Sequence, residues 1–202
     1  MRDGRIPYIL IEIIKFRFED VGQFMDSIRE WRHLSDKERD KRWSRLKKEH
    51  PEPSEYAAEL LSDEYYIADR SERLMYGVLA VALTSAIEYS TLEICKATRV
   101  QIQKQKNDRT PKWKVIWDSI KKQSNILFDS IKGHKAVNKI RILNNCFKHN
   151  GGATNTELAC EFPGEYEIGT DILYEKENWE CLLKDCRTFI LELASRMFCL
   201  ED

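Results

Sequence analysis

The chain has 202 residues, of which 42% are hydrophobic and 33% are charged, with only eight glycines and five prolines. This length suits a single hydrophobic core, and so few turn-forming residues favour helices over a β-sandwich or β-barrel. No stretch has the order of a secretory signal. The longest apolar window, residues 74–87, is shorter than the about 20 residues that a membrane-spanning helix needs. We therefore expect a cytoplasmic protein without membrane contact, whose six cysteines are free thiols.

Two helices are predicted before Pro51. Apolar residues recur in steps of four and three and indicate a first helix that ends near Trp31; they are Ile14, Phe18, Val21, Met25 and Ile28. Ser35 and Glu38 match a capping box, in which each side chain satisfies a free backbone N–H at the start of a helix. They predict that a second, charged helix begins there and ends before Pro51.

A long helical pattern follows over residues 54–97, with a break expected near Ser62 or Asp69. Its second half, residues 74–96, is apolar on most sides, which is typical of a central helix with several neighbours. A polar, basic connection is expected over residues 98–110.

Three more helices are predicted after residue 110. The first begins with Thr110 as N-cap and Pro111 as its first helical residue, and it carries Trp113, Ile116, Trp117 and Ile120. The second covers residues 135–150 and stops at two glycines. The stretch 161–174 reads as a loop or small hairpin, and a final amphipathic helix covers 177–198.

These elements predict an all-α fold in two parts. Residues 1–69 are expected to form an N-terminal helical extension, and residues 70–202 a helical bundle, the two making one compact unit.

The net charge of −1 hides an uneven distribution along the chain. Residues 1–95 hold 15 basic and 19 acidic residues, residues 96–148 hold 14 and 3, and residues 149–202 hold 4 and 12. The basic middle block is typical of a surface that binds a phosphate backbone. It can equally pair with the acidic C-terminal third, and the sequence leaves both interpretations open.

The predicted helix 135–150 carries polar groups along one face. Asn138, Arg141, Asn145 and His149 follow one another in steps of three, four and four. The apolar residues form a separate stripe, which consists of Val137, Ile140, Leu143 and Phe147. An unperturbed imidazole titrates at about pH 6.5 and can act as acid or base. A guanidinium can offset charge on a phosphate.

Each of these residues also has a purely structural interpretation. A histidine in the last turn of a helix interacts favourably with the helix dipole, and Asn-Gly is an ordinary helix end. Arg141 can pair with a carboxylate, for which Glu88 is the candidate because a charge on an apolar helix needs a partner. Asn144 and Asn145 can cap neighbouring backbone groups.

The segment resembles the HEPN family (higher eukaryotes and prokaryotes nucleotide-binding), whose ribonucleases carry Arg, often followed by Asn, and then His near a helix end. The local match is Asn145, Lys148, His149 and the terminating residues 150–152. The wider match is the apolar helix 74–96, which contains Glu88, followed by a Trp-bearing helix. The resemblance implies an up-and-down helical bundle, a site that needs no metal or other cofactor, and a composite site across a homodimer.

The resemblance also implies roles for individual residues. His149, Arg141 and Asn145 would be catalytic: His149 would move the proton, and Asn145 would orient the imidazole or a phosphate oxygen. Lys148, Asn144 and Asn138 would bind the substrate, and Glu88 would support the site. Arg141 and His149 enclose seven residues here, whereas four to six are usual in the family, and Asn144 stands where the tighter pattern has arginine.

The leading hypothesis is a metal-independent endoribonuclease of a bacterial defence or toxin system, which attacks RNA through the ribose 2′-hydroxyl. The alternative is a non-catalytic HEPN module that dimerises, binds nucleic acid or nucleotide, or docks a partner protein of the same system. The altered spacing of Arg141 and His149 favours this alternative. A third hypothesis is an antitoxin-like regulator held by a partner.

Overall fold

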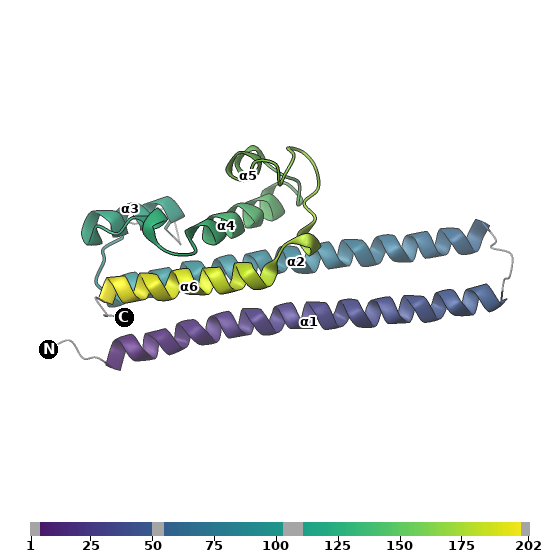
Figure 1. Ribbon diagram of the computed structural model, residues 1–202, viewed down its shortest axis with the longest axis horizontal. Helices are drawn as coiled ribbons and strands as arrows, with labels where there is room; N and C mark the ends of the chain where they lie inside the picture. The colour runs from purple at the N-terminus through teal and green to yellow at the C-terminus, as the bar shows by residue number, and fades with distance from the viewer. Residues whose placement is uncertain (1–4, 50–54, 103–110, 199–202) are drawn as a thin grey trace.

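The computed structural model describes residues 5–49, 55–102 and 111–198, and nearly all of them are helical (Figure 1). The six α-helices are α1 (Arg5–Glu49), α2 (Glu55–Ala97), α3 (Trp113–Ser124), α4 (His134–His149), α5 (Thr156–Glu161) and α6 (Trp179–Phe198). Two 3₁₀ turns, η1 (Phe128–Ser130) and η2 (Tyr174–Lys176), complete the order. The described part of the chain contains no strand, only a single antiparallel bridge between Ala153 and Asp171. The predicted all-α class is therefore confirmed.

The two helices expected before Pro51 are in fact one. α1 continues through Trp31, so the prediction of a break between Trp31 and Ser35 is wrong, as is the capping box at Ser35 and Glu38. No glycine or proline interrupts the chain from residue 23 to residue 49. Asp36 and Glu38 instead form ion pairs within the helix, each with the basic residue three positions later. A capping box starts a new helix only where the chain also turns, and here the chain does not turn.

α2 likewise runs without a break through Ser62 and Asp69. It lies antiparallel to α1 along most of its length, as the ribbon shows. The expected boundary between residues 69 and 70 therefore falls inside one continuous helix.

The core lies where α1, α2, α4 and α6 meet. The apolar stripe predicted for the first helix is buried there, with exposed fractions of 8% or less; its members are Ile14, Phe18, Val21, Met25 and Ile28. The first half of α1 thus belongs to the same core as the C-terminal helices. Burial of this stripe supplies the main driving force for the packing.

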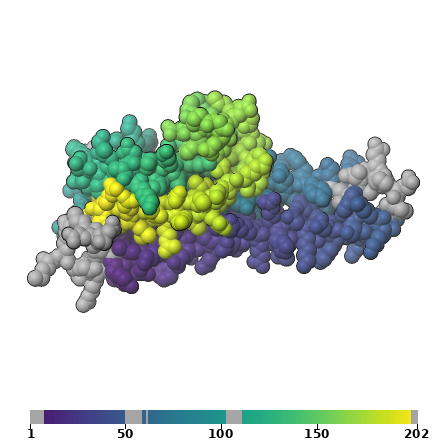
Figure 2. Space-filling view, in the orientation of Figure 1, coloured from purple at the N-terminus to yellow at the C-terminus, as the bar shows by residue number. Residues whose placement is uncertain are grey.

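Beyond the core, the two long helices continue together as a projecting hairpin (Figure 2). Among the described side chains of residues 29–49 and 59–75, none is fully buried. We call these two segments the arm and the rest of the described chain the bundle. The part that extends from the bundle is therefore the C-terminal part of α1 together with the N-terminal part of α2.

The C-terminal elements follow the prediction closely, with two differences, and of the two forms predicted for residues 161–174 the structure has the loop. α3 begins at Trp113 with Lys112 as its N-cap, so Pro111 precedes the helix; Thr110 lies outside the described residues. The short helix α5 was not predicted. The loop between α5 and η2 contains the bridge residue Asp171 but no hairpin strands among the described residues.

Two glycines allow the helices of the bundle to approach closely. A Cβ on Gly133 would lie 2.2 Å from the backbone oxygen of Asp185 in α6, and its φ of +86° favours glycine. A Cβ on Gly77 would lie 2.2 Å from the ring of Phe147, where α2 meets α4.

The five described cysteines are all free thiols, and Cys199 lies outside the described residues. By length and composition, residues 62–97 of α2 could also cross a membrane, although 56% of the most apolar window is buried within the protein. A central helix of a bundle meets the same criteria.

Candidate functional site

The polar face predicted for residues 135–150 exists on α4 and faces solvent. Asn138, Arg141 and Asn145 are partly exposed, and Lys148 and His149 are exposed. The opposite side of the helix is buried; its members include Val137, Ile140, Leu143 and Cys146. The periodicity of the sequence therefore places five of the candidate polar residues on one accessible surface, which we call the α4 face.

Asn144, which was expected to contact a substrate, lies apart from this group. Only 4% of its surface is exposed, and its Oδ1 has no hydrogen-bond partner among the described residues. It lies beside the buried stripe because it follows the buried Ile140 by four residues, which is only about 40° around the helix. A substrate on the α4 face would not reach it.

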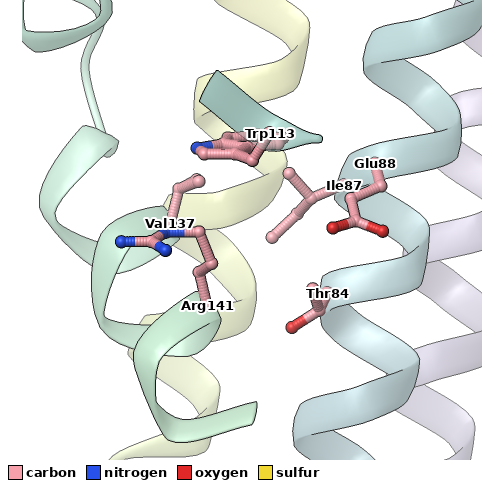
Figure 3. Close-up of a pocket in the computed structure, with 6 residues that line it drawn as sticks. All are labelled: Thr84, Ile87, Glu88, Trp113, Val137 and Arg141. Carbon is pink, nitrogen blue, oxygen red and sulfur yellow. The ribbon is translucent and has the colours of Figure 1, made fainter. Parts of the chain in front are cut away.

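Arg141 is held by residues that the sequence did not predict as its partners. Its Nη2 donates to Glu157 Oε1 of α5 at 2.7 Å and to Asn138 Oδ1 at 3.1 Å. Its Nε is buried without a hydrogen-bond partner among the described residues. The expected pairing with Glu88 is not formed, and Figure 3 shows the guanidinium turned away from that carboxylate.

Glu88 instead lines a small cleft between α2 and α4. The cleft is bounded by six side chains (Figure 3), namely Thr84, Ile87, Glu88, Trp113, Val137 and Arg141. Burial raises the pKa of Glu88 above its ordinary value, and the nearby positive charges of Lys148 and Arg141 partly oppose this shift. The open volume is ≈ 10 Å³, about the space of one water molecule. This cleft cannot hold a nucleotide.

His149 is the last residue of α4. The helix ends as predicted, with Asn150 as C-cap followed by Gly151 and Gly152 at φ of +60° and +90°. His149 lies eight positions after Arg141, which corresponds to about 12 Å along the helix axis. The two side chains therefore lie on the same helix face but are too far apart to contact one phosphate group.

A larger groove, which we call the junction groove, lies beside the end of α4. Its volume is ≈ 520 Å³, within the range of about 300–1,000 Å³ that small-molecule sites occupy. It is lined by residues of α2, by the end of α4 and by the following loop, including Tyr66, Arg70, Arg73, Phe147, Gly151 and Tyr174. Sequence reasoning missed this groove because its walls come from segments about 80 residues apart.

The two arginines of the junction groove differ in their partners. Arg73 donates to Asp171 at 2.8 Å and lies 3.3 Å from Asp69, so its charge is compensated. The guanidinium of Arg70 lies over the ring of Tyr66, 5.5 Å from its centroid, and donates to the Tyr66 hydroxyl at 3.1 Å. This distance is within the about 6 Å of a cation–π contact. No carboxylate of the described chain pairs with Arg70. Its guanidinium is the cation of this groove that remains available to an anion.

The acidic residues after α4 neutralise part of the basic block. Glu157 pairs with Arg141, while Glu165 and Glu177 each lie 2.9 Å from the Nζ of Lys139. The predicted pairing of the basic block with the acidic C-terminal third is therefore partly formed. Other exposed lysines of the basic block form no ion pair among the described residues; they include Lys114, Lys121, Lys122 and Lys148.

The described residues contain no group of three or more His, Cys, Asp or Glu side chains arranged to hold a metal ion. Comparisons of the chain with family models, with curated proteins and with solved structures find no match.

Proposed function

We propose that this protein is a HEPN-type endoribonuclease that cleaves RNA without a metal ion, with the α4 face as its active surface. The observation that carries the proposal is the placement of His149: it is exposed, on the same face as Arg141 and Asn145, and beside Lys148. The junction groove next to it supports the proposal, because its volume suits a nucleotide and Arg70 offers a cation for a phosphate.

The reaction would be an internal transesterification of RNA. The ribose 2′-hydroxyl attacks the adjacent phosphorus, the bond to the 5′-oxygen breaks, and a 2′,3′-cyclic phosphate and a 5′-hydroxyl remain. His149 accepts the proton of the 2′-hydroxyl and delivers it to the leaving 5′-oxygen. Lys148, next to it in the chain, offsets the negative charge that accumulates on the phosphorane oxygens.

Arg141 lies too far along α4 to touch the same phosphate as His149 within one chain. It would bind a neighbouring phosphate of the RNA strand, after exchanging its contact with Glu157 for the substrate. α3, which begins beside the cleft at Trp113, would extend this electrostatic surface with Lys114 and Lys121.

The test is incubation of the purified protein with total tRNA in excess EDTA. The proposal predicts cleavage by the wild type that His149→Ala reduces by about 100-fold or more, the scale of general acid–base catalysis. His33→Ala, which changes another exposed histidine, on the arm, is the control and should leave cleavage unchanged. Cleavage that persists in His149→Ala, or depends on added metal, would refute the proposal.

A second candidate is a non-catalytic HEPN module that binds RNA or an acidic partner, as a docking subunit of a defence or toxin system in the bacterial cytoplasm. It is favoured by the Glu157–Arg141 ion pair, since that pair occupies the guanidinium that the nuclease would need. Glu157→Gln separates the candidates. The nuclease should gain both RNA affinity and cleavage rate, whereas the module should gain affinity alone.

A further inference from the structure

The end of α1 carries a dense run of positive charge at the tip of the arm. Residues 41–48 include five basic residues and no acidic residue. A run of this kind is typical of a surface that binds a phosphate backbone. It lies outside the segments that resemble the HEPN family, and it is not part of the α4 face.

Part of the positive charge of the arm is engaged with α2. Arg42 pairs with Glu64 of α2 at 2.8 Å. Arg39, one turn earlier, lies over the ring of Tyr65 of α2, 5.0 Å from its centroid. Both arginines therefore hold the two helices of the arm together, on the side of α1 that faces α2.

Four other basic residues form a row on the opposite side of α1, which we call the arm row. They follow one another in steps of four, four and three, and they are Lys37, Lys41, Arg45 and Lys48. Helical geometry directs all four about 120–180° away from Arg39, so they face away from α2. Each of them is exposed. The only ion pair that the row forms among the described residues is a long contact of 3.6 Å between Lys41 and Glu38.

The arm row destabilises the helix that carries it. Like charges three or four residues apart on a helix repel each other, and the row contains three successive pairs of this kind. The helix dipole favours basic residues only in the last turn, which accounts for Lys48 but not for Lys37 or Lys41. The described part of the arm has no fully buried side chain that could offset this repulsion. A polyanion bound along the row would remove the repulsion and interact with all four charges.

The geometry of the arm row favours RNA over an anionic membrane as its ligand. The row is one residue wide and about 16 Å long, which fits the charged backbone of a nucleic-acid strand. A helix that binds a membrane surface inserts the apolar face opposite its cations into the lipid, but α2 covers that side of α1. In Figure 1, α1 forms the lower edge of the molecule, whereas α3 and α4, which carry other exposed lysines, lie on the upper side. A flat bilayer cannot contact both surfaces, whereas a folded RNA can.

We propose that the arm row binds the phosphate backbone of RNA, on a different side of the molecule from the α4 face. The row recognises charge and not sequence, since contacts to phosphates carry no direct information about the bases. The choice of RNA as the polyanion rests on the proposed function, but binding at the row requires no cleavage. The protein thus holds a folded RNA at two separate surfaces and cuts it at one of them.

The primary test is the affinity of the full chain for a fluorescein-labelled RNA of tRNA length, measured by fluorescence anisotropy over a range of salt concentrations. Every ribose of this probe is 2′-O-methylated, so it lacks the hydroxyl that the proposed cleavage needs. Lys41→Gln/Arg45→Gln should raise the dissociation constant by about 10-fold at about 0.1 M salt. The slope of the logarithm of the association constant against the logarithm of salt concentration should fall by about 1.4, which is about 0.7 for each lost phosphate contact. Circular dichroism verifies that the variant keeps its helices.

Arg39→Gln/Arg42→Gln is the matched control. It removes the same charge from the same part of α1, but from the side that contacts α2. This variant should change the affinity for RNA by less than about 2-fold and leave the salt dependence unchanged, because neither guanidinium contacts a phosphate. A row variant that binds RNA like the wild type would overturn the proposal. A control that weakens binding as much as the row variant would also overturn it, because net charge alone would then attract the RNA.

Cleavage assays with unmodified tRNA separate this inference from the proposed function. Lys41→Gln/Arg45→Gln should raise KM by about 10-fold and leave kcat unchanged, since the row binds the substrate and takes no part in the reaction. A wild type that does not cleave RNA, but loses affinity for the probe when the row is changed, refutes the proposed function and supports the arm row. A wild type that cleaves RNA, and whose row variant binds the probe equally well, refutes the arm row alone.

Vesicles that contain phosphatidylserine provide the remaining test, since their surface attracts basic segments through the same kind of charge. The protein should not float with these vesicles at about 0.15 M salt. Flotation of the wild type that Lys41→Gln/Arg45→Gln abolishes, together with an unchanged affinity for RNA, would assign the row to a membrane surface and overturn the proposal.

Discussion

The bundle and the arm are built from the same two long helices, but different forces hold them. In the bundle, α1 and α2 bury continuous apolar faces against α4 and α6. In the arm they meet through surface contacts, such as the ion pair of Arg42 with Glu64 at 2.8 Å and the stacking of Arg39 over Tyr65 at 5.0 Å. Exposed ion pairs contribute about 0–1 kcal/mol each. The arm therefore depends on the bundle, which holds the bases of both helices together.

The largest effect is expected where two helices of the bundle touch through a glycine. Gly133→Ala should lower the free energy of unfolding by about 3–4 kcal/mol, because a left-handed alanine is strained and its Cβ displaces the Asp185 carbonyl. Urea denaturation followed by circular dichroism measures this loss. Ser44→Ala, in the arm, serves as the control and should change stability by less than about 0.5 kcal/mol. Equal stability of Gly133→Ala and the wild type would contradict the close approach.

A matched pair of leucines compares the two regions directly. Leu79→Ala removes a side chain that is 1% exposed in the bundle and should cost about 3 kcal/mol through lost burial and the resulting cavity. Leu34→Ala removes one that is 57% exposed in the arm and should cost less than about 0.5 kcal/mol. Denaturation midpoints of the two variants give both values. A similar cost at both positions would show that the arm has a core of its own.

Glu72 sits where the arm joins the bundle, and it makes stability depend on pH. Burial raises its pKa above the ordinary value of 4.5, Arg32 opposes this, and the carboxylates of Glu175 and Asp69 add to the rise. A raised pKa in the folded state means that stability is complete below pH 4.5 and declines as pH rises through the folded pKa. Glu72→Gln should therefore be more stable than the wild type at pH 7 and equal to it at pH 4.

The measurement for Glu72 is the difference in unfolding free energy between variant and wild type at the two pH values. Glu38→Gln, an exposed arm residue, provides the control. A Glu72→Gln variant that is less stable at pH 7 would show that the Arg32 ion pair outweighs the burial of the carboxylate.

The smallest effect is expected within the arm. Arg42→Ala removes the ion pair with Glu64 and should change the unfolding free energy by no more than about 0.5 kcal/mol. The change should disappear in 1 M salt, because screening removes most of a surface interaction. A loss above about 1.5 kcal/mol would mean that the ion pairs, rather than the bundle, hold the arm.

The helices of the bundle were predicted from the sequence better than those of the arm, and the reason is again the difference in burial between the two regions. Ile14 to Ile28 and Val137 to Leu143 follow helical periodicity because burial selects apolar residues at each turn. In the arm no burial imposes such a pattern, so Ser35 and Glu38 resembled a helix start although the helix continues. A capping pattern alone therefore does not set a helix boundary.

The α4 face was predictable as a surface but not as a network of contacts. The spacing alone predicted that Asn138, Arg141 and His149 lie on one face of the helix, because the number of residues between two positions sets the angle between their side chains around the helix axis. The partner of Arg141 is Glu157, on the unpredicted helix α5, and no periodicity connects the two. The junction groove was likewise beyond sequence reasoning, since Arg70 and Gly151 meet only through the tertiary fold.

The central claim is that the α4 face performs metal-free transesterification of RNA. The most direct measurement is the chemistry of the fragment ends after cleavage of a defined tRNA in EDTA, read by phosphatase and polynucleotide kinase sensitivity. The account predicts 2′,3′-cyclic phosphate and 5′-hydroxyl ends that are absent with His149→Ala. Fragments with 3′-hydroxyl and 5′-phosphate ends, or no fragments at all, would contradict it.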